Sequence, residues 1–240
     1  MSMKIPVNEV FGPVVQGEGA MMGLKVIFVR TGGCDYRCVW CDSMFTWDGS
    51  EKHVLLTPSE ILRQVVELGG HNAQWITVSG GNPALIGEPM GQFIQLAHRA
   101  GYQLSIETQG SKWQDWLTTV DQLVLSPKPP SSRMVTDFPL LQEILHSAHN
   151  HKVPVSLKVV VFDDTDYAYA QKVHAAFPFV PFYLQVGNDD LDAYDQRDLA
   201  DHLLAKFRWL ADKMLHDPAF NDVRVLPQLH TLAWGNKRKV

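Results

Sequence analysis

Short apolar segments recur along the chain and are separated by longer stretches with helical spacing. Six of these segments are rich in β-branched and aromatic residues, which is typical of buried strands. They are residues 26–30, 75–79, 103–107, 122–126, 155–161 and 182–186. A later segment, residues 224–229, is a weaker strand candidate because Pro227 interrupts it.

Helices are predicted between these strands. One begins at Thr57, a capping residue that is followed by a proline and by an acid in the first turn, and it ends at Gly69 and Gly70. Three more are expected, at residues 90–100, 164–177 and 195–216. Alternating strands and helices predict an α/β fold with mostly parallel strands. No repeat or linker divides the chain, so we expect a single domain at residues 1–240.

The charge balance excludes some classes of partner. The chain has 21 Lys and Arg against 26 Asp and Glu, a formal net charge of −5. This balance argues against broad binding to nucleic acid or to an anionic membrane. No apolar run approaches the ~20 residues of a membrane span. The first residues lack the apolar core of a secretory signal, so we expect a cytoplasmic protein with no direct nucleic-acid or membrane partner.

The most informative segment contains all three cysteines of the chain, Cys34, Cys38 and Cys41, just after the first predicted strand. Thiolates are soft ligands that suit zinc or iron–sulfur centres. Both kinds of site usually take four protein ligands, so here one position must be filled by another group. The same spacing would also place three buried thiols on one face of a helix. A zinc site could be completed by His53 or His71.

The Cys-x-x-x-Cys-x-x-Cys spacing, with Trp40 before the last cysteine, resembles the signature of the radical S-adenosylmethionine (SAM) enzymes. The resemblance implies a partial βα barrel and a 4Fe–4S cluster on Cys34, Cys38 and Cys41, with one iron left for SAM. The segment at residues 79–83, Ser-Gly-Gly-Asn-Pro, resembles the Gly-Gly-Glu-Pro motif that meets the amino group of SAM, although it has asparagine for glutamate. Taken alone, it also suits an ordinary turn between a strand and a helix.

Further motifs narrow the resemblance. They are a Gln-Gly-Glu-Gly turn at residues 16–19, Arg30 before the cysteines, Cys-Asp-Ser at 41–43, Ser-Pro-Lys at 126–128 and Gln-Leu-His at 228–230. From about residue 5 to the last residues, the chain resembles the 7-carboxy-7-deazaguanine synthases. That family converts 6-carboxy-5,6,7,8-tetrahydropterin to 7-carboxy-7-deazaguanine with loss of ammonia, on the route to queuosine. A 5′-deoxyadenosyl radical starts the ring contraction, SAM is re-formed and Mg²⁺ assists.

The resemblance also implies roles for individual residues. The expected substrate contacts are Gln16, Glu18, Arg30, Ser79 and His230. The expected SAM contacts are Trp40, Asp42, Gly81, Ser126, Lys128 and Gln185. Ser43 is the expected Mg²⁺ ligand, and His230 is a candidate for proton transfer during ammonia loss.

Each of these residues also has a structural interpretation. The Gln-Gly-Glu-Gly segment could be a solvated turn, Ser43 could bond to local backbone, and the Ser-Pro-Lys segment could be a stiff loop. A lone histidine such as His230 is more often structural. Glu107 and Thr108 are further pocket candidates, and Lys158 is left unassigned because a lysine in mid-strand can face either side.

Two other functions remain open at this stage. One is a radical SAM activase that installs a glycyl radical on a partner protein, and the other is a non-enzymatic Cys/His zinc module. Arg30, whose planar donor fork suits a carboxylate, and the Gln-Gly-Glu-Gly turn favour a small pterin over a protein substrate. The resemblance further implies a homodimer and a flavodoxin-like or other low-potential electron donor.

Overall fold

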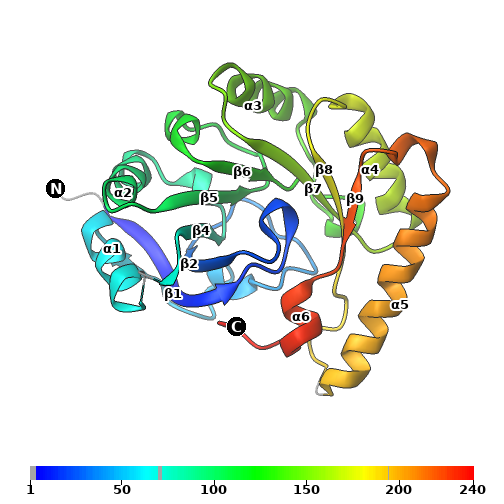
Figure 1. The fold of residues 1–240 in the computed structure, drawn as a ribbon, viewed down its shortest axis with the longest axis horizontal. Helices are drawn as coiled ribbons and strands as arrows, with labels where there is room; N and C mark the ends of the chain where they lie inside the picture. Colours follow the sequence, from blue (N-terminus) through cyan, green and yellow to red (C-terminus); the bar gives the residue numbers. More distant parts are fainter. Residues whose placement is uncertain (1–3, 70–71, 194) are drawn as a thin grey trace.

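The computed structural model describes residues 4–69, 72–193 and 195–240. Nine strands form one sheet in the order β3-β1-β2-β4-β5-β6-β7-β8-β9 (Figure 1). Neighbours from β2 onward are parallel, whereas β1 runs antiparallel to both β2 and β3. Strands β3 and β9 are the two ends of this order, so the sheet is open. The predicted partial barrel of mostly parallel strands is confirmed.

The strands have the following bounds: β1 (Ile5–Val15), β2 (Lys25–Thr31), β3 (Val54–Leu56), β4 (Trp75–Gly80), β5 (Gln103–Thr108), β6 (Gln122–Leu125), β7 (Val155–Val161), β8 (Phe182–Val186) and β9 (Arg224–Leu226). The helices are α1 (Pro58–Glu67), α2 (Glu88–Arg99), α3 (Phe138–Asn150), α4 (Asp164–Ala176), α5 (Gln196–Leu215) and α6 (Leu229–Trp234). The six predicted strands match β2 and β4 to β8, and the four predicted helices match α1, α2, α4 and α5. Strands β1 and β3 and helices α3 and α6 were not predicted.

Each parallel strand has one apolar face. Ile27, Ile76 and Leu104 lie at matching positions of β2, β4 and β5 and are fully buried. They belong to one hydrophobic core with helix residues such as Ile61 and Phe93. The helices therefore cover this face of the sheet, as expected where helices connect parallel strands.

The other face of the same strands carries polar side chains. Arg30 and Ser79 are partners in the register of β2 and β4. Glu107 of β5 and Lys158 of β7 alternate with core residues in the same way. Because successive side chains of a strand point to opposite faces, this polar set faces the concave inside of the open barrel.

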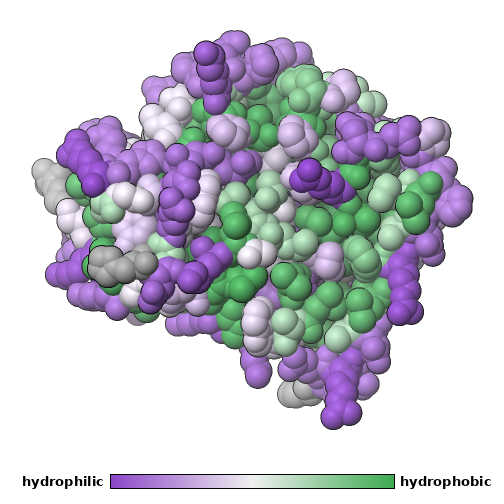
Figure 2. All heavy atoms as spheres, viewed as in Figure 1, coloured by the Kyte–Doolittle hydropathy of each residue, from purple (hydrophilic) through white to green (hydrophobic). Residues whose placement is uncertain are grey.

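The outer surface is mostly polar. In the view of Figure 2, hydrophilic side chains form the rim, including the outer edge along α5, and apolar ones gather over the region of β9 and α6. None of the helices in the described parts of the chain is long and apolar enough to cross a membrane.

Candidate active site

A cavity of about 490 Å³ opens at the carboxyl ends of the parallel strands. Its walls come from the β1–β2 connection, the cysteine segment after β2, the ends of β4, β5 and β7, helix α6 and the chain end. Every predicted site residue except Gln185 lines it, and so do Glu107, Thr108 and Lys158. The fold therefore brings together residues that are far apart in the sequence.

The three cysteines face this cavity and form no disulfide. Their segment is an irregular loop, so the interpretation as buried thiols on one helix face is wrong. Burial raises the pKa of all three thiols, that of Cys41 to about 11. Protonated thiols become thiolate ligands when a metal centre binds, because its positive charge displaces the protons. Three thiols aimed into one cavity thus fit a metal centre.

The spacing of the thiols favours a cluster over a single ion. A tetrahedral zinc ion with Zn–S bonds of about 2.3 Å brings sulfur atoms to within about 3.8 Å of one another. All three cysteines lie in the described part of the chain, and at least one pair of their sulfur atoms is more than 4.8 Å apart. His53 does not line the cavity, and His71 lies outside the described residues. The donor set therefore fits a larger, bridging iron–sulfur group better than zinc.

A close backbone contact fixes the start of the cysteine loop. Gly81, just after β4, lies so close to Gly33 that a Cβ atom at Gly81 would stand 1.9 Å from the Gly33 oxygen. The Asn82 N–H donates to the same oxygen at 2.7 Å. The Asn82 side chain turns away from the cavity and bonds to Asp35 and Thr108. Glycine is therefore required at residue 81, where this loop meets the end of β4.

Lys158 and Glu18 form an ion pair inside the cavity. Lys158 Nζ lies 2.5 Å from Glu18 Oε2 and 3.9 Å from Glu107 Oε2, and the Lys158 side chain is 6% exposed. Burial would raise the pKa of Glu18, but the charges of Lys158 and His230 and the hydrogen bonds it accepts lower that pKa to about 2. Burial would lower the pKa of Lys158, yet the two carboxylates raise it overall. Both groups are charged at neutral pH.

Two amide side chains extend this network. Gln16 Nε2 donates to Glu107 at 2.8 Å, and Gln228 Nε2 donates to Glu18 at 2.7 Å. The two carboxylates thus face the cavity with their orientation fixed by neighbours from the β1–β2 connection, β7 and the segment before α6. Fixed carboxylates can accept hydrogen bonds from the N–H edge of a heterocycle.

Arg30 lies near the end of β2, just before the cysteine loop. Its Nη1 donates to Ser43 Oγ, and its Nε lies 3.0 Å from Glu9 Oε1. The guanidinium packs near the rings of Phe11 and Phe45, 5.6 and 5.5 Å from their centroids. Packing on two rings holds a planar donor fork at the cavity wall, where it suits a carboxylate.

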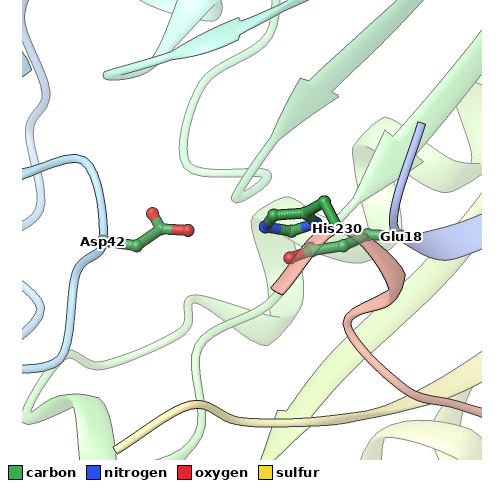
Figure 3. Close-up of side chains that lie close together, drawn as sticks. All are labelled: Glu18, Asp42 and His230. Atoms are coloured by element: carbon green, nitrogen blue, oxygen red, sulfur yellow. The ribbon is translucent and has the colours of Figure 1, made fainter. Parts of the chain in front are cut away.

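His230 of α6 faces Glu18 and Asp42 (Figure 3), and one ligand atom of each lies within 4.8 Å of the others. Gly17 makes this position possible, because a Cβ atom there would stand 2.1 Å from His230 Nδ1. The Leu229 N–H donates to the Gly17 oxygen at 3.0 Å and ties α6 to the same turn. The glycine of the Gln-Gly-Glu-Gly turn thus serves to seat the histidine.

The chain is similar to known proteins in sequence and in fold. The family of 4Fe-4S single cluster domains matches residues 15–127, which include all three cysteines. The curated 7-carboxy-7-deazaguanine synthase of Bacillus cereus is 52% identical over 239 residues, which cover 99% of both chains. The Bacillus subtilis protein of the same name is 51% identical over 244 residues and covers both chains completely.

This chain belongs to the 7-carboxy-7-deazaguanine synthase family. QueE from Escherichia coli has the same fold, with a TM-score of 0.67 and 20% identity over 95% of each chain. The structure of native anSMEcpe with bound AdoMet gives a TM-score of 0.54, with 18% identity over 81% of this chain and 61% of that one.

One residue expected from the family resemblance is not brought to the cavity. Gln185 of β8 is fully buried, and its amide accepts from the Gly19 N–H at 3.5 Å and donates to the Leu226 oxygen at 3.3 Å. It therefore supports the turn that carries Glu18. Conversely, Lys158 and Gln228 hold the carboxylates and had no assigned role in the sequence analysis. The signal for Lys158 was a charged residue within the apolar strand at 155–161.

Replacing Lys158 by methionine should destabilise the protein in a pH-dependent way. It leaves the Glu18 carboxylate buried without its cation, which costs about 3–5 kcal/mol of unfolding free energy near neutral pH. In the unaltered chain the pKa of Glu18 falls from 4.5 to about 2, so the stabilisation is present above 4.5 and is lost as the pH falls toward 2. In the variant, burial instead raises this pKa.

Denaturant unfolding between neutral pH and about pH 5 measures the effect. We expect the deficit of Lys158→Met to shrink as the pH falls, because protonation of Glu18 removes the unpaired charge. The double variant with Glu18→Gln should recover most of the loss at neutral pH. A deficit that is the same at every pH and in the double variant would contradict this account of the pair.

Proposed function

We propose that the protein is a 7-carboxy-7-deazaguanine synthase that converts 6-carboxy-5,6,7,8-tetrahydropterin to 7-carboxy-7-deazaguanine with loss of ammonia. The observation that carries the proposal is one cavity that combines three thiols, a carboxylate-binding arginine and two oriented carboxylates. We also propose that residues 1–240 act as one domain, since one sheet supplies all these groups.

Cys34, Cys38 and Cys41 hold the 4Fe–4S cluster in this proposal. When bound, the cluster and SAM would supply a 5′-deoxyadenosyl radical for hydrogen abstraction. For SAM we propose contacts from the residues that flank the thiols on the cavity wall: Trp40, Asp42, Gly81, Ser126 and Lys128. Lys128 supports this placement, since its Nζ donates to Ser126 at 3.1 Å and lies 5.8 Å from the Trp40 ring centroid. A cation and an aromatic face suit a carboxylate and an adenine ring.

The substrate would lie between Arg30 and the carboxylates of Glu18 and Glu107. Arg30 binds its carboxylate through the donor fork. Glu18 and Glu107 accept hydrogen bonds from the amino-pyrimidinone edge, and Lys158 keeps Glu18 ionised. Gln16 holds Glu107, and Ser79 Oγ donates to Glu107 at 3.4 Å. Opposite charges at opposite ends fix the direction in which an asymmetric heterocycle can bind.

His230 is the proposed proton carrier. It faces the cavity beside Glu18, and an imidazole can give and take a proton near neutral pH. Glu18 is less suited to this role, because Lys158 and Gln228 occupy both its oxygens and keep it ionised. The leaving ammonia would receive its proton through His230.

We propose Mg²⁺ at Ser43. The hydroxyl of Ser43 donates to Asp42 Oδ1 at 3.1 Å and accepts from Arg30, which leaves one acceptor position for a cation. Mg²⁺ prefers oxygen ligands and retains several waters, so one hydroxyl and the substrate carboxylate suit it. The neighbouring Asp42 carboxylate adds favourable charge.

The remaining proposals concern the cellular setting. A homodimer, a flavodoxin-like or other low-potential electron donor, and a cytoplasmic location follow from the family resemblance. Three free thiols support a reducing compartment. Because the net charge is −5, we propose the pterin rather than tRNA as the molecule that binds directly.

Anaerobic turnover tests the proposed reaction. Reconstituted protein, supplied with the carboxylated pterin, SAM, Mg²⁺ and a reductant, should form 7-carboxy-7-deazaguanine and release ammonia. The variant Cys41→Ala should lose both iron and product. If the unaltered protein retains its cluster but forms no deazapurine, the proposed reaction is wrong and a glycyl-radical activase becomes the better assignment.

The magnesium proposal has its own test. We expect Ser43→Ala to weaken the stimulation of turnover by Mg²⁺ and to leave the iron content unchanged, since the hydroxyl is not a cluster ligand. Titration of Mg²⁺ against the turnover rate, with iron measured in the same samples, makes the comparison. Loss of iron, or an unchanged Mg²⁺ response, would show that Ser43 does not bind the cation.

A further inference from the structure

The last six residues, 235–240, which we name the tail, leave α6 and line the cavity. Figure 1 shows the C-terminus beside the N-terminal strands, far from α5. The start of the tail is anchored by Asn236, which accepts a hydrogen bond from Asn188 at 2.8 Å and donates to the Asp190 oxygen at 2.9 Å. Its far end is held by Arg238.

Arg238 makes contacts with two carboxylates and one ring. Its Nη2 donates to Glu9 Oε2 at 2.9 Å, and its Nη1 donates to Glu51 Oε1 at 2.5 Å. Its guanidinium lies 3.6 Å from the centroid of Phe45, whose ring also packs near Arg30. The tail is thus latched to β1, to the segment before β3 and to the aromatic residue that supports Arg30.

Glu9 connects this latch to the proposed carboxylate site. Its side chain is 3% exposed, with Oε1 close to Arg30 and Oε2 shared by Arg238 and by Lys239 at 3.4 Å. Although Arg30 Nε and Glu9 Oε1 are 3.0 Å apart, neither atom forms a hydrogen bond. The Nε–H of Arg30 is therefore not directed at Glu9 Oε1 although the two groups form an ion pair, and Nη1 of Arg30 bonds to Ser43.

We propose that Arg238 is a positioning residue that engages Glu9 so that Arg30 stays directed into the cavity, which makes the tail a determinant of selectivity for a carboxylated substrate. The inference rests on the proposed function, because Arg30 is its carboxylate site. Three cations, Arg30, Arg238 and Lys239, lie around Glu9, so the charge of this carboxylate is shared among them. Without Arg238, Glu9 would turn to Arg30 and form the bidentate pair that arginine and carboxylate prefer.

Binding measurements on Arg238→Gln test the inference. We compare 6-carboxytetrahydropterin with tetrahydropterin, which lacks the carboxylate, on anaerobic reconstituted enzyme with SAM and no reductant. Loss of a properly directed charged hydrogen bond should weaken binding of the carboxylated pterin about tenfold and leave the other pterin unaffected. Arg238→Lys keeps the charge but not the fork, so it should recover only part of the loss.

Two further variants separate the latch from general effects. Glu51→Gln removes a latch contact outside the cavity and should give an intermediate loss. Arg208→Gln removes one exposed arginine of α5 that does not line the cavity, and it should match the unaltered protein. Carboxypeptidase digestion followed by mass spectrometry should show faster loss of the tail in Arg238→Gln than in Arg208→Gln.

The outcomes distinguish the two proposals. If Arg238→Gln prefers the carboxylated pterin as strongly as the unaltered protein does, the positioning role is wrong and the proposed function stands. Equal digestion of the tail in all variants would likewise overturn the latch. If the unaltered protein itself binds both pterins equally, Arg30 is not the carboxylate site, and the substrate assignment fails together with the inference.

Discussion

The side chains on the inner face of the sheet are arranged around the ion pairs of Lys158, whose ammonium group is buried within the open barrel. A lysine with a 6% exposed side chain is stable only if its charge is compensated. Glu18 on the β1–β2 connection and Glu107 on β5 supply the compensating negative charge. Their contacts with Lys158 hold the β1–β2 connection, β5 and β7 together. Gln228, just before α6, donates a hydrogen bond to Glu18. This bond also holds His230, in the first turn of α6, near Glu18. A charge on β7 thus helps to place α6 over the cavity, together with the bond from the Leu229 N–H to the Gly17 oxygen.

The cavity has a second charged region, with the opposite arrangement. Around Lys158 two carboxylates surround one cation, whereas around Glu9 three cations meet a carboxylate. An asymmetric ligand with a carboxylate at one end and N–H donors at the other matches this division. The three thiols line the same cavity. A bound cluster would therefore lie beside a ligand whose orientation the two charged regions already fix. Orientation by the protein and radical supply by the cofactors are in this way separate tasks.

Much of this arrangement follows from local sequence patterns. Each parallel strand was predicted because its core face is apolar over several residues, as at residues 155–161. Strand β1 was missed because the buried charge of Glu9 interrupts the apolar alternation between Val7 and Phe11, and because Gly12 and Pro13 follow it. The same Glu9 carboxylate that weakens the strand pattern forms an ion pair with Arg30. A charged residue on the inner face therefore makes the hydrophobic pattern of its own strand harder to detect in the sequence.

Motif resemblance predicted most of the cavity wall but could not supply contacts made across long distances in the sequence. Lys158 had two possible faces, and its contacts with Glu18 and Glu107 show that it faces the cavity. Gln185 fits a motif position yet turns toward Gly19 and Leu226. The role of Arg238 depends on partners that lie more than 180 residues earlier, at Glu9 and Glu51. Such pairings result from packing and leave no local trace.

The three thiols should hold a cluster with one iron open to SAM, because the chain contains no fourth cysteine. Electron paramagnetic resonance of the reduced cluster, recorded before and after SAM is added, tests it most directly. We expect a clear change of the signal, as the amino and carboxylate groups of SAM become ligands of the open iron. An identical signal in both spectra, with all iron positions bound by the protein, would contradict it.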